Sequence, residues 1–562
     1  MAVEAFGLEH STSAARRPGA FGTALEACTP KTAERWVWLA YDQLNTSFID
    51  ALPETTGTTG VVLIESTHKA KQQPYHQQKL AVLLSNQRHF ALELQRSGIP
   101  VLYLLSARPY AHVLEELGAS LGHIHAFQHA ERSTRLEVVG LETTGVLMVH
   151  EHPGWLTSRK WFVDSVGEQP PFRMDAFYRT VRQHTGWLME AGKPVGGKYS
   201  FDAENRFPWK GEPAAPSPPV FDLDEIDSEV AVMVEQRFKH HPGAVDMTSV
   251  PTSAEDIERA MRFAMEVLPW FGRYEDAMSE QSRGLFHSRL ATLLNLHRVW
   301  PADLVKCALG SGAPLNSVEG FVRQLIWREY VHHIHDVTEG FTRLDIARAS
   351  STRGAGWSGG GEVDDGHPNF LQQSRRLPMA YWGRKSGLRC LDASVESVME
   401  DGWTHHIPRL MVLSNLANLM DIDPRELTDW FHAAFIDAYD WVVEPNVLGM
   451  GTFALGSVMM TKPYVSGSAY INKMSDHCSA CAFHPKKNCP ITSMYWAYLY
   501  RHRTAFAGNH RMAIAMKNVE RRSDEQKATD EATYLHVVKT LEQGESLEPP
   551  THGDLRRWTS SS

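Results

Sequence analysis

Short apolar runs alternate with amphipathic stretches in the first part of the chain. Apolar runs bounded by polar or turn residues predict buried strands at residues 35–41, 60–65, 99–105 and 123–127. Apolar side chains at helical spacing predict helices at residues 75–97 and 110–120, the first ended by Gly98. Strands that alternate with helices are typical of a parallel, Rossmann-like α/β sheet, which we expect at residues 35–165.

The hydrophobic pattern changes after this region. Residues 172–192 predict an amphipathic helix ended by Gly192, and a proline-rich linker follows to residue 220. From residue 221 strand signals fade, and helical periodicity predicts an all-α domain that extends to about residue 525. Its helices are expected at residues 254–268, 281–298, 316–336, 391–400, 407–420, 424–443 and 491–505.

These patterns divide the chain into five parts. They are a flexible extension (1–34), an α/β domain (35–165), an interdomain helix and linker (166–220), an all-helical domain (221–525) and a C-terminal tail (526–562). The tail after residue 541 is polar and is predicted to be disordered. Residues 354–359 fit a GxGxxG pattern, but no strand precedes them and no helix follows, so we interpret them as a flexible loop.

The composition is that of an ordinary globular protein, with 43% apolar and 22% charged residues in a chain of 562. No apolar run is long enough for a membrane span, and the N-terminus lacks a secretory pattern, so we expect a cytoplasmic location. A net charge of −10 argues against general coating of nucleic acid. Two stretches are nevertheless basic: residues 171–210 carry seven Lys or Arg against four acids, and residues 498–522 carry six against one.

Four of the six cysteines have a spacing that suits a metal centre. Cys478 and Cys481 form a CxxC pair, Cys489 follows shortly after them, and Cys390 lies upstream in the same helical region. Four thiolates can hold an iron–sulfur cluster or a structural zinc ion, and the spacing by itself also leaves unrelated thiols open. So few cysteines in a long chain do not form a disulfide framework.

Several segments in combination resemble one known family. They are residues 196–206, 285–290, 319–323, 327–330, 404–412, 444–450, 462–464 and 470–475, together with the cysteine run. Over residues 36–525 the chain is similar to the iron–sulfur bacterial cryptochromes and photolyases, the group that contains the bacterial (6-4) photolyases. The resemblance implies the photolyase/cryptochrome fold, with an α/β antenna domain joined to an all-helical FAD-binding domain. It also implies a [4Fe–4S] cluster on Cys390, Cys478, Cys481 and Cys489, although the loop before Cys489 is shorter than usual.

The resemblance also assigns FAD contacts to particular positions. They are Phe286, His287, Ser288, Arg289, Leu290, Trp327, Glu329, Asp437, Asp440 and Asn446. The hydroxyl of Ser288 and the guanidinium of Arg289 suit phosphate oxygens. Asp437, Asp440 and Asn446 match positions beside the flavin ring edge, where a carboxylate or amide can tune N1 and N5.

Electron and proton carriers are implied as well. Trp382 and Trp430 match family positions that relay electrons to the flavin, whereas Phe431 stands where some relatives have a redox-active tyrosine. His405 and His406 match the paired histidines of the lesion pocket, and we expect His406 to be the proton donor.

One position of the lesion pocket departs from the family pattern Trp-Val-Glu-x-Pro-Asn. This chain has Val443 in place of that glutamate, and Glu444 follows it. One residue rotates a helical side chain by about 100°. Glu444 therefore substitutes only if the backbone leaves α geometry before Pro445, as residues before proline tend to do. Tyr470 matches a further pocket residue and is retained.

Two further sites follow from the resemblance. Relatives hold 6,7-dimethyl-8-ribityllumazine as an antenna in the α/β domain, where Glu65 and residues 85–89 match the pocket. Contacts with DNA phosphates are expected from Lys193, Lys198, Arg206, Arg501, Arg503 and Arg511.

Two functions compete on this sequence. The first is light-driven repair of (6-4) pyrimidine photoproducts in damaged DNA by electron transfer from reduced FAD, by a protein that we expect to be a monomer. The second is a cryptochrome-like blue-light photoreceptor with the same cofactors and no repair. Val443 and Phe431 favour the photoreceptor, while His405, His406 and the basic segments favour repair. Repair of another lesion, or of single-stranded DNA, is a third possibility.

Overall fold

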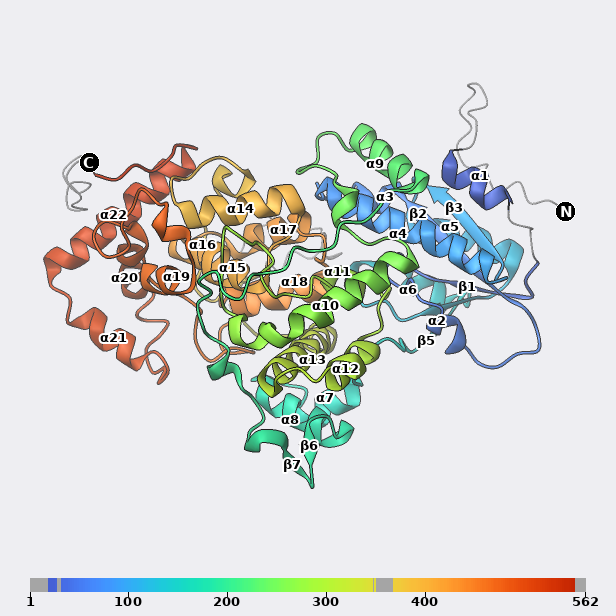
Figure 1. Ribbon diagram of the computed structural model, residues 1–562, viewed down its shortest axis with the longest axis horizontal. Helices are drawn as coiled ribbons and strands as arrows, with labels where there is room; N and C mark the ends of the chain where they lie inside the picture. Colours follow the sequence, from blue (N-terminus) through green and yellow to red (C-terminus); the bar gives the residue numbers. More distant parts are fainter. Residues whose placement is uncertain (1–18, 28–31, 347, 350–366, 551–562) are drawn as a thin grey trace.

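The computed structural model describes residues 19–27, 32–346, 348–349 and 367–550. An α/β part and a larger helical part lie side by side, with α1 beside the sheet and α22 at the opposite end of the molecule (Figure 1). In the described part of the chain, no helix is both long and apolar enough to cross a membrane, as the sequence predicts.

Five parallel strands form the predicted sheet, in the order β3-β2-β1-β4-β5. They are β1 (Arg35–Trp38), β2 (Thr59–Ser66), β3 (Val101–Ser106), β4 (Ile124–Phe127) and β5 (Leu147–His150). Trp38 and Val62 face one apolar cluster and Val37 and Val61 the other, so the strands read as continuous apolar runs. The edge strand β5 was not predicted, because it is short and exposes Met148.

Helices cover both faces of this sheet (Figure 1). They include α4 (Gln77–Arg96), α5 (Tyr110–Leu121) and α6 (Arg132–Thr143), with the short α2 (Ser47–Asp50) and α3 (Thr67–Ala70) after strand ends. Helix α4 is buried on nearly all sides, because the sheet lies on one side of it and α9 (Glu225–Arg237) packs on another.

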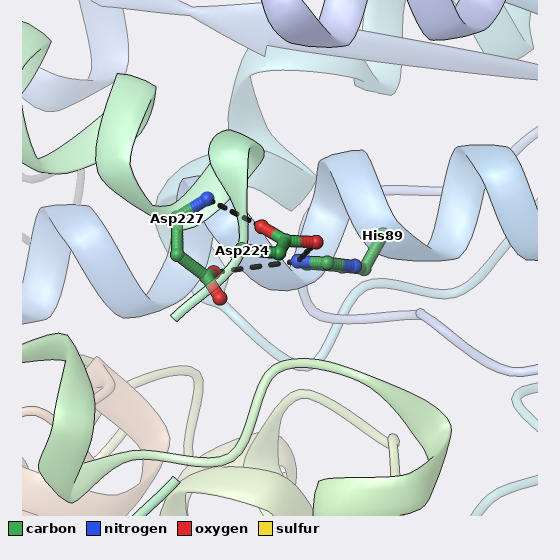
Figure 2. Close-up of side chains that lie close together, drawn as sticks. All are labelled: His89, Asp224 and Asp227. Carbon is green, nitrogen blue, oxygen red and sulfur yellow. Dashed lines mark hydrogen bonds and ion pairs between the residues drawn. The ribbon is translucent and has the colours of Figure 1, made fainter. Parts of the chain in front are cut away.

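A polar cluster fixes α9 on α4 (Figure 2). Asp224 accepts hydrogen bonds from the backbone N–H groups of Ile226 (2.8 Å) and Asp227 (2.9 Å), and so caps α9. The carboxylate of Asp227 lies 3.3 Å from Nε2 of His89 and also accepts hydrogen bonds from the hydroxyls of Ser85 and Thr252. The carboxylate oxygens of Asp227 thus have protein donors, and the cluster is explained by helix docking.

The N-terminal extension is partly ordered, which corrects the prediction of flexibility for residues 20–27. Helix α1 (Ala20–Ala27) buries Phe21 against the ring of Tyr103 and the guanidinium of Arg88. The sequence signal was weak because only one side chain of this short helix is buried. Residues 1–18 and 28–31 lie outside the described residues.

Between the two parts, α7 (Arg159–Val166) and α8 (Met174–Thr185) precede the linker. Helix α8 ends at Gly186, whose φ of 72° suits a glycine C-cap, and not at Gly192 as predicted. Residues 189–194 instead form the hairpin of β6 (Met189–Glu190) and β7 (Lys193–Pro194). The linker beyond has only two short 3₁₀ turns, η1 (Val195–Gly197) and η2 (Asp202–Glu204).

One large apolar core unites the helical part. The long helices are α10 (Ala254–Tyr274), α13 (Leu315–Val337), α14 (Arg389–Asp401), α17 (Pro424–Ala434) and α20 (Pro490–Arg501). Shorter elements are α11 (Ala291–Asn295), α12 (Pro301–Gly310), η5 (Met379–Trp382), α15 (His406–Pro408), η6 (Arg409–Ser414), α16 (Asn415–Leu419), α18 (Asp440–Glu444), η7 (Pro445–Gly451), α19 (Ser468–Met474), η8 (His477–Ser479) and α21 (Ala513–Glu520). The short strands β8 (Arg348–Ala349) and β9 (His367–Pro368) pair outside this core.

Two predicted helices are interrupted. The helix expected at 281–298 is helical only at α11, because Leu285 and Arg289 adopt positive φ values of 41° and 57°. The helix expected at 424–443 breaks between α17 and α18, where Phe435 is extended. Both interruptions border the cavity described below.

The predicted C-terminal tail contains a packed helix, which corrects the boundary at residue 525. Helix α22 (Asp524–Glu542) starts at a capping box made by Ser523 and Gln526 and packs on α20. The sequence did not predict this helix because its pattern of apolar and polar residues is only weakly amphipathic. Leu547 is also buried, whereas residues 551–562 and the GxGxxG segment 354–359 lie outside the described residues.

Candidate functional site

A cavity of about 310 Å³ lies within the helical part, a volume at the lower end of the range of ligand sites. Its walls come from the end of α10, the irregular segment before α11, α13, the 403–414 region, α17 and residues 437–450. Of the residues predicted to bind FAD or act on a lesion, those that line it are His287, Ser288, Arg289, Leu290, Trp327, Asp437, Asn446, His405 and His406.

Arg289 provides a cationic corner in this cavity. Its positive φ turns the backbone, and its guanidinium stacks on the ring of Trp403 at 4.7 Å. Within the described part of the chain the guanidinium has no hydrogen bond or ion pair, and burial lowers its pKa. An unpaired guanidinium beside the hydroxyl of Ser288 is a suitable binding group for phosphate.

Another part of the lining holds two fixed polar groups, Asp437 and Asn446. Asp437 accepts two hydrogen bonds from Arg409, at 2.9 and 2.8 Å, and Arg409 stacks on the ring of Phe435 at 4.2 Å. Asn446 accepts a hydrogen bond from Nε1 of Trp327 (3.2 Å) and donates one to the carbonyl of Val442 (2.7 Å). Both partners fix the orientation of the Asn446 amide at the cavity surface.

Three predicted FAD contacts lie behind the wall instead of facing the cavity. Glu329 accepts hydrogen bonds from the N–H and hydroxyl of Thr157, and burial raises the pKa of its carboxyl to about 7. Asp440 accepts hydrogen bonds from the N–H groups at the start of α6 and so joins the helical part to the α/β part. Phe286 packs on Tyr274 in a separate apolar cluster. These side chains support the cavity but do not line it.

The two predicted lesion-pocket histidines have different surroundings. His405 is buried, and its ring stacks on that of His287 at 4.1 Å. The ring of His406 is exposed to the open cavity but sits deep in the molecule, and desolvation, followed by the charge of Arg409, lowers its pKa to about 4. His406 is therefore neutral at pH 7 in the free protein, and proton donation requires a negative charge nearby to raise its pKa.

Val443 lines the cavity, and Glu444 does not replace the missing glutamate. The carboxylate of Glu444 is buried between Arg425 (3.0 Å) and His335 (2.8 Å), whose interactions lower its pKa to about 2 despite burial. The backbone of Glu444 stays in α geometry, with φ −57° and ψ −51°, and continues into the π-helix η7. The bend before Pro445 that Glu444 would need to replace the glutamate is therefore absent, and Val443 makes this part of the wall apolar.

The predicted electron carriers lie outside the cavity. Trp430 is buried, donates a hydrogen bond from Nε1 to the carbonyl of Tyr381 (2.9 Å), and contacts Phe431 edge-on at 5.1 Å. Phe431 itself lines the cavity, so it separates Trp430 from any ligand there. Trp382 ends η5 and is partly buried. Tyr470 does not line the cavity either, and its hydroxyl donates to Asp276 (3.1 Å).

The four cysteines predicted as ligands are neighbours in space. Cys390 lies in the first turn of α14, Cys478 in η8, and Cys489 at the N-cap of α20. Burial, and then repulsion from the thiols of Cys489, Cys478 and Cys481, raises the pKa of Cys390. All four are described, and no three of their Sγ atoms lie within 4.8 Å of one another. The thiols of a tetrahedral zinc site would be closer, at about 3.8 Å for Zn–S bonds of about 2.3 Å.

A second, smaller cavity of about 50 Å³ lies at the carboxyl ends of the sheet strands. Its lining includes Tyr41, Lys69, Tyr75, Glu131 and Tyr439. Sequence reasoning missed this set; the signal was present in polar and aromatic residues just after strands, where α/β sheets bind ligands.

Charged groups are concentrated in the second cavity. Lys69 pairs with Glu131 at 2.8 Å, and Tyr41 also donates to Glu131. Glu65 does not line the cavity: it forms a buried ion pair with Arg88 and accepts a hydrogen bond from Tyr103 (2.7 Å).

The two cavities share a wall. On α17, Phe431 lines the large cavity and the next residue, His432, lines the small one. In the same way Asp437 faces the large cavity, and Ala438 and Tyr439 face the small one.

The predicted DNA contacts are not equally available. Arg501 is held by Asp421 (2.9 Å) and Glu531 (3.7 Å) in the contact between α20 and α22, which removes it as a free phosphate ligand. Arg206 pairs with Asp202, and Lys198 with Glu204, at exposed positions. The remaining three, Lys193, Arg503 and Arg511, are exposed and make no ion pair among the described residues.

Comparisons with known proteins point to one family. Residues 37–249 match the family described as deoxyribodipyrimidine photo-lyase-related protein, and residues 321–478 match the FAD binding domain of DNA photolyase. A protein of Agrobacterium fabrum named (6-4) photolyase is 34% identical over 501 residues, which cover 84% of this chain and 92% of the relative.

Two solved structures share the fold. A bacterial class III photolyase from Agrobacterium tumefaciens has a TM-score of 0.53 at 15% identity and covers 92% of this chain and 99% of its own. An archaeal photolyase from Sulfolobus tokodaii has a TM-score of 0.50 at 13% identity, with 94% and 99% covered. Together with the α/β and helical parts and the cavity of the helical part, these matches show that the chain belongs to the photolyase/cryptochrome family and carries its FAD-binding domain.

Proposed function

We propose that this protein repairs (6-4) pyrimidine photoproducts in DNA by light-driven electron transfer from reduced FAD. The observation that carries the proposal is the cavity wall, where unpaired Arg289 and the neighbouring His405 and His406 face one space. Its chemistry suits an anionic cofactor beside a substrate that exchanges protons. The (6-4) photolyase relative, similar over most of both chains, supports the same activity.

FAD, when bound, supplies the light-absorbing one-electron donor. In this chain Ser288 and Arg289 would bind its phosphates, while Asn446 and the Asp437–Arg409 pair would lie beside its ring. The apolar wall at Val443 excludes water from that side. His406, neutral in the free protein, becomes a proton donor only when negative charge in the cavity raises its pKa.

We assign the cysteine site to a [4Fe–4S] cluster in preference to zinc. A cubane cluster binds each thiolate to a different iron, which spaces the sulfurs more widely than a single ion does. The separation of the Sγ atoms supports this choice, and the nearness of Cys489 to the other three supports it as the fourth ligand despite the short loop.

Metal analysis of anaerobically purified protein tests the cluster. We expect iron and acid-labile sulfide, lost in Cys489→Ser and retained in Cys307→Ser, whose thiol is exposed and unrelated. Zinc without sulfide would refute the assignment.

We propose that an antenna chromophore binds in the small cavity and not at the site around Glu65. Its tyrosines can stack on a pterin-like or lumazine ring, and Lys69 and Glu131 can bind ring oxygens and nitrogens. The volume is below that of typical ligand sites, so 6,7-dimethyl-8-ribityllumazine fits only if side chains such as Tyr75 move. Reconstitution with the lumazine tests this, with binding followed by the quenching of lumazine fluorescence. The Glu131→Gln variant should lose lumazine binding, and the Glu65→Gln variant should retain it.

The photoreceptor remains the second candidate function, favoured by apolar Val443 and by Phe431 between Trp430 and the cavity. Photorepair separates the two. Chemically reduced protein, illuminated with a (6-4) oligonucleotide, should restore thymines, and His406→Asn should abolish this with FAD retained. Absence of repair by fully reduced wild-type protein would favour the photoreceptor. A third outcome is repair by chemically reduced protein but not by oxidised protein under illumination. In that case Phe431 limits only the photoreduction of FAD.

A further inference from the structure

An exposed aromatic ring lies beside the end of helix α10, and residues at that end line the large cavity. Phe207 is 45% exposed, and Arg273 lies over its ring at 4.6 Å. Neither residue lines the cavity, but Phe271 and Glu275, two residues before and two after Arg273, do. Two residues before Phe207, Asn205 donates a hydrogen bond to Glu275 (2.9 Å).

The segment that carries Phe207 is anchored by hydrogen bonds, so the ring has a defined place. The N–H of Phe207 donates to the carbonyl of Arg273 (3.2 Å). Further along, Nε1 of Trp209 donates to the carbonyl of Pro213 (2.8 Å), and the hydroxyl of Tyr274 donates to the carbonyl of Glu212 (3.0 Å). Trp209 also packs on the apolar cluster under α10.

The cations beside this ring are available to a partner. Arg273 and Lys210 are exposed, and neither side chain makes a hydrogen bond or ion pair among the described residues. Arg206, on the other side of Phe207, pairs with Asp202 and lies near Asp276, which holds Tyr470. Free positive charge thus lies beside the ring, and the neighbouring Arg206 connects the segment through Asp276 to Tyr470, a predicted lesion-pocket residue.

Resting on the proposed function, we propose that Phe207 and Arg273 form a stacking platform for an unstacked DNA base beside the flipped lesion. Arg273 covers one face of the ring and leaves another for a base, while Arg273 and Lys210 bind the adjoining phosphates. A base–aromatic stack needs an unpaired nucleotide, which lesion flipping creates next to the cavity. The platform therefore discriminates opened, damaged DNA from intact duplex.

Binding of labelled oligonucleotides tests the platform with the FAD-loaded protein. Phe207→Ala should weaken binding of a duplex with a (6-4) lesion by about 5- to 100-fold and hardly change binding of intact duplex. Phe207→Tyr should retain affinity, because the ring remains. Phe370→Ala serves as the matched control, since Phe370 is 37% exposed but packs on Phe453 and belongs to a different segment from Phe207 and Arg273.

Salt dependence separates stacking from charge. Arg273→Ala should reduce the slope of log affinity against log salt by about 0.9, and Phe207→Ala should leave it unchanged. Unchanged lesion affinity in Phe207→Ala, with normal FAD content, overturns the platform and leaves the proposed function intact. A changed oligomeric state without changed DNA affinity overturns it in favour of a protein contact. Wild-type protein that binds no damaged DNA overturns both the platform and the repair proposal.

Discussion

At the scale of single residues, the cavity depends on which charges have partners. Among the described residues Arg289 has no charged partner, whereas Glu444 has two and is removed from the cavity by them. The difference follows from position: Arg289 lies on an irregular segment with positive φ, and Glu444 lies on a continuous helix that turns its side chain away from the cavity. Because the glutamate stands one position later than in the family pattern, the cavity wall carries Val443 and the buried core behind it carries the carboxylate of Glu444.

Glu444→Ala should cost stability and spare the cavity chemistry. It removes the carboxylate beside buried His335 and one of the two that pair with buried Arg425, the other being Asp429 (3.0 Å), a loss of about 3 kcal/mol, seen as a lower unfolding midpoint in denaturant. Glu396→Ala, which removes a half-exposed partner of Lys385, should cost at most about 1 kcal/mol. Lost repair at unchanged stability would mean that Glu444 acts on substrate after all.

Arg289→Met should weaken FAD binding by about 10- to 100-fold, because one charge-assisted hydrogen bond contributes about 1.5–3 kcal/mol. Flavin absorbance per chain after dialysis measures the loss. Arg283→Met is the nearby control, since Arg283 pairs with surface carboxylates and does not line the cavity. Equal flavin content in both variants would contradict a phosphate role for Arg289.

At the scale of elements, breaks in regular structure position the site more than the helices do. The ends of α17 and α18 and the irregular segment before α11 all border the cavity. Helix α22 is a different case: the sequence predicted a tail here, but the segment is a regular helix that packs on the fold. Its apolar residues bury one narrow stripe against α20.

Paired substitutions on α22 test this packing. Val537→Asp places a charge at a fully buried position and should cost about 3 kcal/mol or more, whereas Leu535→Asp, 49% exposed on the same helix, should cost less than about 0.5 kcal/mol. Thermal unfolding measures both. Equal midpoints for the two variants would mean that the segment is a tail, as the sequence alone predicted.

Apolar periodicity predicted four of the strands and most long helices, since buried faces leave a direct trace in the sequence. The interruptions at Arg289 and Phe435 could not be predicted, because they depend on tertiary contacts around the cavity. Spacing singled out the candidate cysteine ligands and resemblance the candidate FAD contacts, yet of the latter Glu329 and Asp440 bind backbone groups of distant segments. The small cavity was missed because its lining comes from several strand ends and α17 at once.

At the scale of the whole molecule, buried neutral histidines make stability depend on pH. His129, His297 and His333 are buried, and burial lowers each pKa to about 3. The unfolded chain binds these protons below about pH 6.5 and the folded chain does not, so stability falls as pH falls. Each group contributes about 1.4 kcal/mol per pH unit.

Thermal unfolding between pH 7.5 and 4 should show this loss. Carboxyls with a raised pKa, such as Asp42 at about 7, act in the opposite direction until the unfolded carboxyls are also protonated. The steep part of the decline should therefore lie below about pH 4.5. His297→Asn should flatten the profile, and a wild-type midpoint that stays constant down to pH 4 would contradict the assignment.

The wall between the two cavities has a thermodynamic consequence. Phe431 and His432, and likewise Asp437 and Ala438, are neighbours in the chain but face different cavities. A ligand that immobilises this wall from one side reduces the entropy lost when a second ligand binds from the other. Two such occupants would then be linked, each raising the affinity of the other by the same factor.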